Sequence, residues 1–235
     1  MNRYESTPGD EARIGLRFLY RAGADRYAPL VVFIHGRAGN RSVMWPFERG
    51  IPEHCHIVSF EAFLPDPIGG WSWWDMQTPG SKREAIHYAA NKFTNSLAAF
   101  IAHYSLEPRA RIGLGFSQGS VLLSAVTLLE LTPFDGIGIL AGFVFLPERK
   151  PSIAERLSVF VAHGTKDQTI SIERARTGVR TLKSWGVQVE FIEEDVEHKV
   201  GIQGTRALKS WIHGLLSEVE AKGIPIWIVC LICIS

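Results

Sequence analysis

The chain has 235 residues, of which 46% are hydrophobic and 21% are charged, and its formal net charge is +1. This size and composition suit one α/β domain that can bury a full core. The near-neutral charge, without a long basic run, argues against nucleic acid or an anionic membrane surface as a partner.

Two features of the sequence bear on location. The first ten residues are polar and lack the apolar core of a signal peptide. The three cysteines, Cys55, Cys230 and Cys233, are too few for a disulfide framework. We therefore expect a cytoplasmic protein without structural disulfides.

An apolar segment, residues 224–235, ends the chain. Twelve residues are too few to cross a bilayer as a helix, which needs about 20, so we expect no integral membrane span. The segment either packs on the domain, pairs with a second subunit, lies in a membrane interface or derives from the expression vector. We favour packing or a homodimer contact. The domain itself is then expected over residues 1–223.

Strand and helix patterns alternate along the chain. Continuous apolar runs predict strands buried on both faces, and apolar residues at every third or fourth position predict amphipathic helices. In chain order we expect an edge strand at 12–21, strands at 28–34 and 56–60, a helix at 83–104, a strand and helix on either side of Ser117, strands at 137–145 and 158–162, a helix at 172–182, a strand at 187–192 and a helix at 208–219. This order predicts a mostly parallel sheet of about seven strands with helices on both faces and no large cap domain.

The pattern G-x-S-x-G occurs at residues 115–119, between an apolar strand and an apolar helix. We call these residues the nucleophile turn. Gly115 and Gly119 leave room for the strand and helix backbones to approach each other, so that Ser117 can adopt a strained angle and expose its hydroxyl. The context predicts that Ser117 is a nucleophile.

A nucleophilic serine needs a histidine to take its proton and an acid to orient that histidine. In an open α/β sheet such groups lie on loops at the carboxyl ends of strands, in the order Ser, acid, His. Asp167 is the only acid on the loop at 163–167, and His198 is the only histidine on the loop at 193–198. We therefore predict a catalytic triad of Ser117, His198 and Asp167.

An ester-cleaving serine also needs two backbone N–H groups that bind the oxyanion. One is expected from Gln118, directly after the nucleophile, and the other from the glycine-rich loop after the strand at 28–34. That loop, residues 35–39, is called the oxyanion loop below. Arg37 is its expected donor, through the main chain.

Residues 28–215 resemble the phospholipase/carboxylesterase family of small α/β-hydrolases, which includes acyl-protein thioesterases. The resemblance rests on Ile34–Gly39, Gly69–Asp75, Gly115–Gly119, His163–Asp167 and His198. It implies an α/β-hydrolase fold and the hydrolysis of carboxylic esters or thioesters by the same three residues without a cofactor or metal. The sequence departs from the family at Glu197, where a glycine is usual, and at Arg37, where a small or apolar residue is common.

Aromatic residues near these motifs are the expected substrate contacts. The residues predicted to line the pocket are Trp73, Trp74, Phe116 and Phe145. The expected substrate is a small-molecule ester with a short to medium acyl chain. Two alternatives are an acyl-protein thioesterase or lysophospholipase, which shares this machinery, and a non-catalytic binding protein of the same fold.

Overall fold

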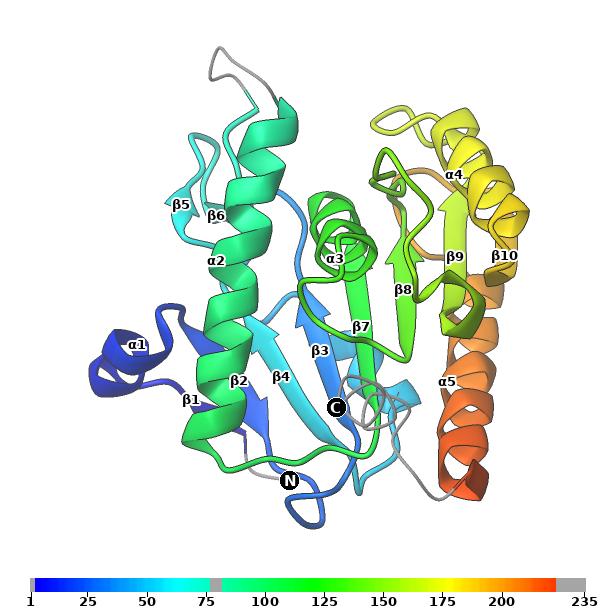
Figure 1. Cartoon of the computed structure of the whole chain (residues 1–235). Coiled ribbons are helices and arrows are strands. Elements are labelled where there is room, and N and C mark those ends of the chain that lie inside the picture. Colours follow the sequence, from blue (N-terminus) through cyan, green and yellow to red (C-terminus); the bar gives the residue numbers. More distant parts are fainter. Residues whose placement is uncertain (1–2, 77–81, 223–235) are drawn as a thin grey trace.

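A computed structural model describes residues 3–76 and 82–222 and contains an eight-stranded sheet in the order β1-β2-β4-β3-β7-β8-β9-β10 (Figure 1). The strands are β1 (Tyr4–Glu5), β2 (Phe18–Arg21), β3 (Leu30–Ile34), β4 (His56–Phe60), β7 (Arg111–Phe116), β8 (Gly136–Leu140), β9 (Ser158–Gly164) and β10 (Gln188–Glu194). All neighbours from β4 to β10 pair in parallel, whereas β1 and β2 run antiparallel to their neighbours. A separate hairpin joins β5 (Leu64–Pro65) to β6 (Trp71–Ser72).

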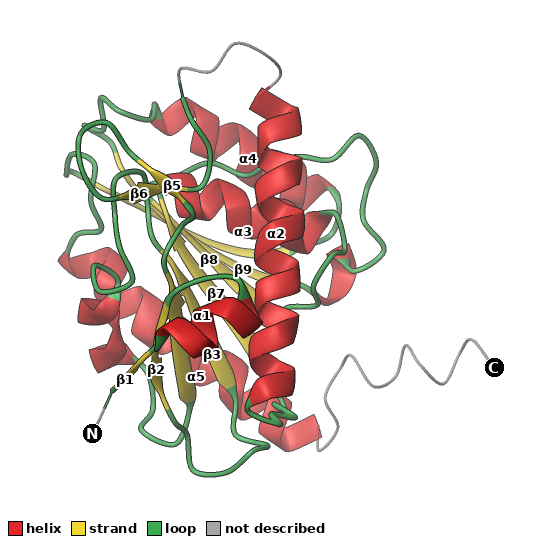
Figure 2. Cartoon of the chain, turned by 90° about the vertical axis from the view of Figure 1, so that its left-hand side faces the viewer, coloured by secondary structure: helices red, strands yellow, loops and turns green. Residues whose placement is uncertain are grey.

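Helices cover both faces of the sheet, as Figure 2 shows in a view turned by 90°. They are α1 (Pro8–Ile14), α2 (Lys82–His103), α3 (Gln118–Leu128), α4 (Ile172–Ser184) and α5 (Ile202–Lys222), with short 3-10 helices η1 (Trp45–Gly50) and η2 (Ala154–Arg156). Helices α2, α3 and α4 pack on one face, and α5 packs with η1 on the other. The described residues contain no large cap domain, so the predicted α/β-hydrolase fold is confirmed.

Strand β3 shows why the buried strands are apolar throughout. Its five residues are all fully buried, with Val32 and Ile34 in the core below α2 and α3. Val31 and Phe33 point to the opposite face and join the core below α5. Because successive side chains alternate between faces, a strand covered on both sides needs apolar residues at every position.

Two predicted strands are much shorter in the structure than expected. The strand expected at 12–21 is wrong in its first half, because a capping box between Thr7 and Asp10 starts α1 and only residues 18–21 join the sheet. The strand expected at 137–145 ends at Leu140, because Ala141 adopts a left-handed backbone with φ of 45°. The residues after it form a loop instead.

Two further findings concern the apolar segments. No helix among residues 3–76 and 82–222 is long and apolar enough to cross a membrane. The terminal segment 224–235, for which packing or dimerisation is expected, lies outside the described residues.

Candidate active site

The structure places Ser117 on the sharp turn between β7 and α3, with φ of 52° and ψ of −114°. A backbone of this kind costs a non-glycine residue free energy and persists only where its surroundings enforce it. The two glycines of the nucleophile turn allow this. A Cβ on Gly115 would lie 2.5 Å from the Gly119 carbonyl oxygen, and one on Gly119 would lie 2.2 Å from that of Ile34. The backbones of β3, β7 and α3 therefore meet without side chains between them.

His198 lies within hydrogen-bonding distance of both other residues of the predicted triad. His198 Nε2 is 3.0 Å from Ser117 Oγ, and His198 Nδ1 is 2.7 Å from Asp167 Oδ2. Asp167 follows β9 and His198 follows β10, so neighbouring parallel strands deliver both side chains to the same sheet edge. This order of contacts suits proton transfer from the serine to the imidazole.

Asp167 is held as a carboxylate. Its Oδ1 accepts hydrogen bonds from the backbone N–H groups of Thr169 at 2.8 Å and Ile170 at 2.9 Å. Burial alone would raise the pKa of Asp167, but hydrogen bonds from the Ile170 N–H, His198 and the Thr169 N–H lower it below its ordinary value. The fixed carboxylate leaves only Oδ2 to accept the His198 Nδ1–H, which sets the tautomer that a base requires.

The oxyanion loop lies directly beside Ser117. A Cβ on Gly36 would be 3.2 Å from the Ser117 Cβ, so only a glycine allows this approach. The main-chain N–H groups of Arg37 and Gln118 have no acceptor within the described part of the chain, and both residues line the same pocket as Ser117. Two unpaired donors beside a nucleophile are what an oxyanion hole requires.

Polar contacts hold the oxyanion loop in place. The Arg37 guanidinium donates to both carboxylate oxygens of Asp66, at 2.8 and 3.2 Å. Ser72 Oγ accepts from the Ala38 N–H at 3.1 Å and donates to Asp66 at 2.7 Å. The hydrogen bonds from Arg37 and Ser72 lower the pKa of Asp66 to about 2. The side chain of Arg37 thus anchors the loop, while its main-chain N–H stays available.

Gln118 has a second role that its sequence position does not predict. Its side-chain oxygen accepts the Trp73 N–H at 2.9 Å, and its side-chain nitrogen donates to the Trp74 carbonyl at 2.9 Å. The residue that is expected to supply one oxyanion donor therefore also holds the tryptophan loop, residues 69–75, against the nucleophile turn. No motif marks this role, because both partners are backbone atoms more than 40 positions away.

His35 supports the oxyanion loop as a neutral residue. Its Nδ1–H donates to the Gly36 carbonyl at 2.6 Å, and its Nε2 accepts the Ala62 N–H at 3.0 Å. Burial lowers the pKa of His35 to about 4, despite the opposing effect of the Gly36 carbonyl. A protonated ring would lose the bond to Ala62 and place a charge in the core.

This arrangement predicts a pH-dependent stability. The pKa of His35 is about 4 in the folded chain and 6.5 for an ordinary histidine, so the unfolded chain binds the proton more tightly between these values. The free energy of unfolding should fall by about 3 kcal/mol as the pH drops from above 6.5 to 4. Urea unfolding across this range should show a shallower fall for His35→Gln than for the parent.

The matched control for that experiment is His54→Gln, because His54 is exposed. His56, whose pKa burial also lowers, contributes equally to all three proteins. If His35→Gln and His54→Gln show the same pH dependence, then His35 is not the titrating group.

A pocket of about 450 Å³ opens beside the nucleophile. Its walls are mostly apolar, with basic side chains among them, as is usual where a ligand has both an apolar body and polar groups. The lining residues are Arg37, Trp74, Met76, Lys82, Arg83, Ile86, Ser117, Gln118, Val121, Phe143, Val144, Phe145, Leu146, Thr169, Ile170 and Arg174.

Two of the four predicted substrate contacts, Trp74 and Phe145, line this pocket. The structure places the other two elsewhere. Trp73 is fully buried in the core. Its indole N–H donates to the His35 carbonyl at 2.8 Å, so Trp73 supports the oxyanion loop instead of lining the pocket. The Phe116 ring packs against the ring of His198, with centroids 5.2 Å apart, and lies outside the pocket lining.

The described residues, 3–76 and 82–222, contain no group of three or more histidine, cysteine, aspartate or glutamate side chains placed to hold a metal ion.

The chain is similar to known proteins over most of its length. A family model described as Phospholipase/Carboxylesterase matches residues 20–216. The carboxylesterase of Bacillus cereus has a similar structure, with a TM-score of 0.77 and 17% identity over 87% of this chain and 97% of that chain. A carboxylesterase from Mesorhizobium loti matches with a TM-score of 0.76 and 18% identity, covering 91% of this chain and 100% of that chain. SOBER1 of Arabidopsis thaliana matches with a TM-score of 0.68 and 20% identity, covering 80% of this chain and 99% of that chain. No protein with a curated function matches the sequence significantly.

Proposed function

Because this chain belongs to the phospholipase/carboxylesterase family and is a carboxylic ester hydrolase, we propose that it works through a covalent acyl-enzyme on Ser117. The observation that carries the proposal is the continuous hydrogen-bonded series from Ser117 Oγ through His198 to Asp167. It ends at a pocket of small-molecule size, in which the serine hydroxyl is a lining group.

In the proposed mechanism, His198 Nε2 takes the Ser117 proton as the oxygen attacks the ester carbonyl. The main-chain N–H groups of Arg37 and Gln118 bind the oxyanion that develops. His198 then donates its proton to the leaving alcohol, and a water molecule, activated by the same imidazole, releases the acid. Asp167 stabilises the imidazolium formed in each half of the reaction.

We propose short to medium acyl chains as the preferred substrates. The pocket of about 450 Å³ has apolar walls, including Trp74, Ile86 and Val121, but it must hold polar groups at its basic side chains as well. A sixteen-carbon palmitoyl chain would compete with those polar groups for this space. The pocket size therefore favours a carboxylesterase over a hydrolase of long-chain lipids or acyl-proteins.

The test is hydrolysis of p-nitrophenyl esters from acetyl to palmitoyl, together with labelling by a fluorophosphonate. We expect a label on Ser117 and the highest kcat/KM between butyryl and octanoyl esters. A maximum at palmitoyl would instead favour the thioesterase or lysophospholipase alternative. A folded protein that neither hydrolyses any ester nor takes up the label would be a binding protein with a hydrolase fold.

A further inference from the structure

Four of the side chains that line the pocket beside Ser117 are basic. Its four cations are Arg37, Lys82, Arg83 and Arg174, and none of the described lining residues is Asp or Glu. The charge of Arg37 is balanced by the bidentate pair with Asp66. The other three make no ion pair with any acid in the described ranges, 3–76 and 82–222. The pocket therefore carries an excess of positive charge.

Aromatic rings, rather than carboxylates, hold two of these cations over the pocket wall. The Arg83 guanidinium lies 4.6 Å from the centre of the Phe145 ring and donates weakly to the Leu146 carbonyl, at 3.3 and 3.4 Å. The Arg174 guanidinium lies 3.5 Å from the centre of the Phe143 ring. Both rings belong to the loop after β8, and all four residues line the pocket. Stacking on a ring leaves the N–H groups in the guanidinium plane able to donate to a carboxylate, and in Arg83 these are the N–H groups that the weak bonds to Leu146 do not use.

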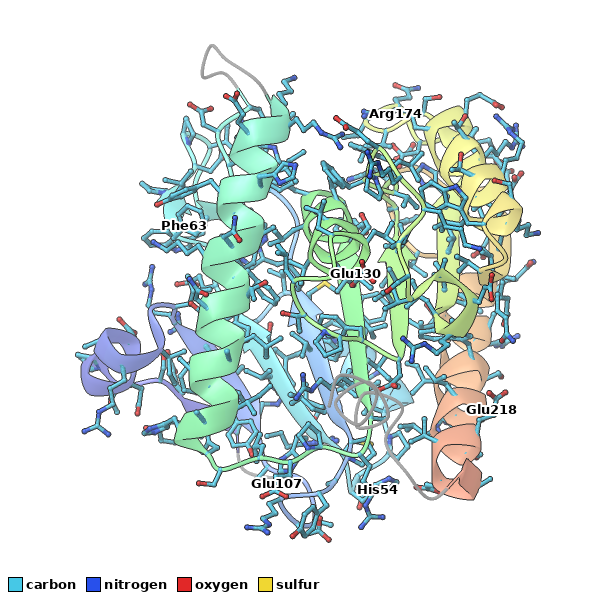
Figure 3. All side chains as sticks on the ribbon, viewed as in Figure 1. His54, Phe63, Glu107, Glu130, Arg174 and Glu218 are labelled. Atoms are coloured by element: carbon cyan, nitrogen blue, oxygen red, sulfur yellow. The ribbon has the colours of Figure 1, made fainter. Side chains whose placement is uncertain are left out.

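The two arginines come from different elements that meet at the pocket. Arg83 lies in the first turn of α2, and Arg174 lies in the first turn of α4. Figure 3 shows Arg174 on the side of α4 that faces α2. The N-terminal ends of both helices add partial positive charge to that of the side chains. An anionic group between them would meet two guanidinium forks and two favourable helix ends.

We infer that the substrate is an ester that carries a second, ionised carboxyl group, such as a half-ester of a dicarboxylic acid. Its ester carbonyl lies at Ser117, and its free carboxylate lies at Arg83 and Arg174. The hydrocarbon between the two groups contacts the apolar wall at Trp74 and Val121. This inference rests on the proposed function, because it identifies the class of ester that the same pocket selects.

The kinetic test compares monomethyl adipate with methyl hexanoate, which share a six-carbon acyl chain and differ in the terminal carboxylate. We expect kcat/KM to be higher for monomethyl adipate by roughly tenfold or more, since a hydrogen bond to a charged group contributes about 1.5 kcal/mol or more, which corresponds to about tenfold. The double variant Arg83→Gln/Arg174→Gln should bring the ratio of the two kcat/KM values close to one. Adding NaCl should lower the ratio for the parent and leave it constant for the double variant.

The matched control is Arg180→Gln, which removes a positive charge from α4 outside the pocket lining. It should keep the ratio of the parent. Thermal unfolding of each variant checks that the fold is retained. A parent ratio of one or less, or a ratio that the double variant leaves unchanged, overturns the inference.

A binding experiment separates this inference from the proposed function. Titration calorimetry with adipate and with hexanoate does not depend on turnover, and adipate should bind the parent more tightly than hexanoate and lose about tenfold in the double variant. Hydrolysis of both methyl esters without a preference for adipate in either assay overturns the inference alone. Adipate binding that requires Arg83 and Arg174, without hydrolysis of any ester, overturns the proposed function alone. The absence of both overturns both.

Discussion

Ser117→Ala should lower kcat for ester hydrolysis by about 10⁴- to 10⁶-fold, which is the size of effect found when the nucleophile of a serine hydrolase is removed. The methyl group cannot form the acyl-enzyme, and His198 loses the proton that it would otherwise take at 3.0 Å. The oxyanion donors and the pocket remain, so substrate binding should change far less than kcat. Steady-state kinetics with p-nitrophenyl butyrate measures both.

Ser184→Ala is the control for this variant, because Ser184 is exposed near the end of α4 and its hydroxyl bonds only to a backbone carbonyl within that helix. It should retain the activity of the parent. Fluorophosphonate should label the control and leave Ser117→Ala unmodified. If Ser117→Ala kept a tenth of the parent kcat, Ser117 would not be the nucleophile.

Asp167→Asn should lower kcat by about 10⁴-fold with little change of structure. The amide oxygen can keep the hydrogen bonds from the Thr169 and Ile170 N–H groups, so the NH₂ group takes the place of Oδ2. That group faces His198 Nδ1 as a donor. The imidazole must then carry its proton on Nε2, where it cannot accept the proton of Ser117.

The measurement is again kcat, with Asp195→Asn as the control. Asp195 lies on the loop that precedes His198, is exposed and pairs only with Lys166. Its replacement removes the same charge from the same region. A similar loss of activity in both variants would indicate a general effect of charge, and full activity in Asp167→Asn would exclude Asp167 as the orienting acid.

The buried strands were predictable because a strand that is covered on both faces is a continuous run of apolar residues. The strands expected at 28–34, 56–60 and 158–162 correspond to β3, β4 and β9, whose residues are almost all buried. The N-terminal region was less predictable. Its first helix depends on a local cap at Thr7 rather than on a periodic apolar pattern, and the partial alternation of apolar and polar residues at 12–21 is typical of a strand.

The site was predictable where topology determines position. Chemistry at the ends of parallel strands must converge on one edge, and this rule is enough to select Asp167 and His198. The direction of a side chain within an irregular loop has no comparable rule. Trp73 and Trp74 are adjacent residues with identical side chains, yet Trp73 lies in the core and Trp74 lines the pocket. The placement of Arg83 and Arg174 in one pocket was likewise not predictable from the sequence, because α2 and α4 come together only in the folded chain.

The two side-chain hydrogen bonds of Gln118 link the size of substrate that the pocket accepts to the rate of turnover. A bulky substrate that moves the Trp74 backbone must break the hydrogen bond from the Gln118 side-chain nitrogen to the Trp74 carbonyl, and the displacement then reaches the residue whose backbone N–H is the proposed oxyanion donor. Oversized esters should therefore be penalised in turnover more than in binding. The enzyme then selects substrates by size through kcat rather than through binding. Large esters should therefore bind and act as competitive inhibitors.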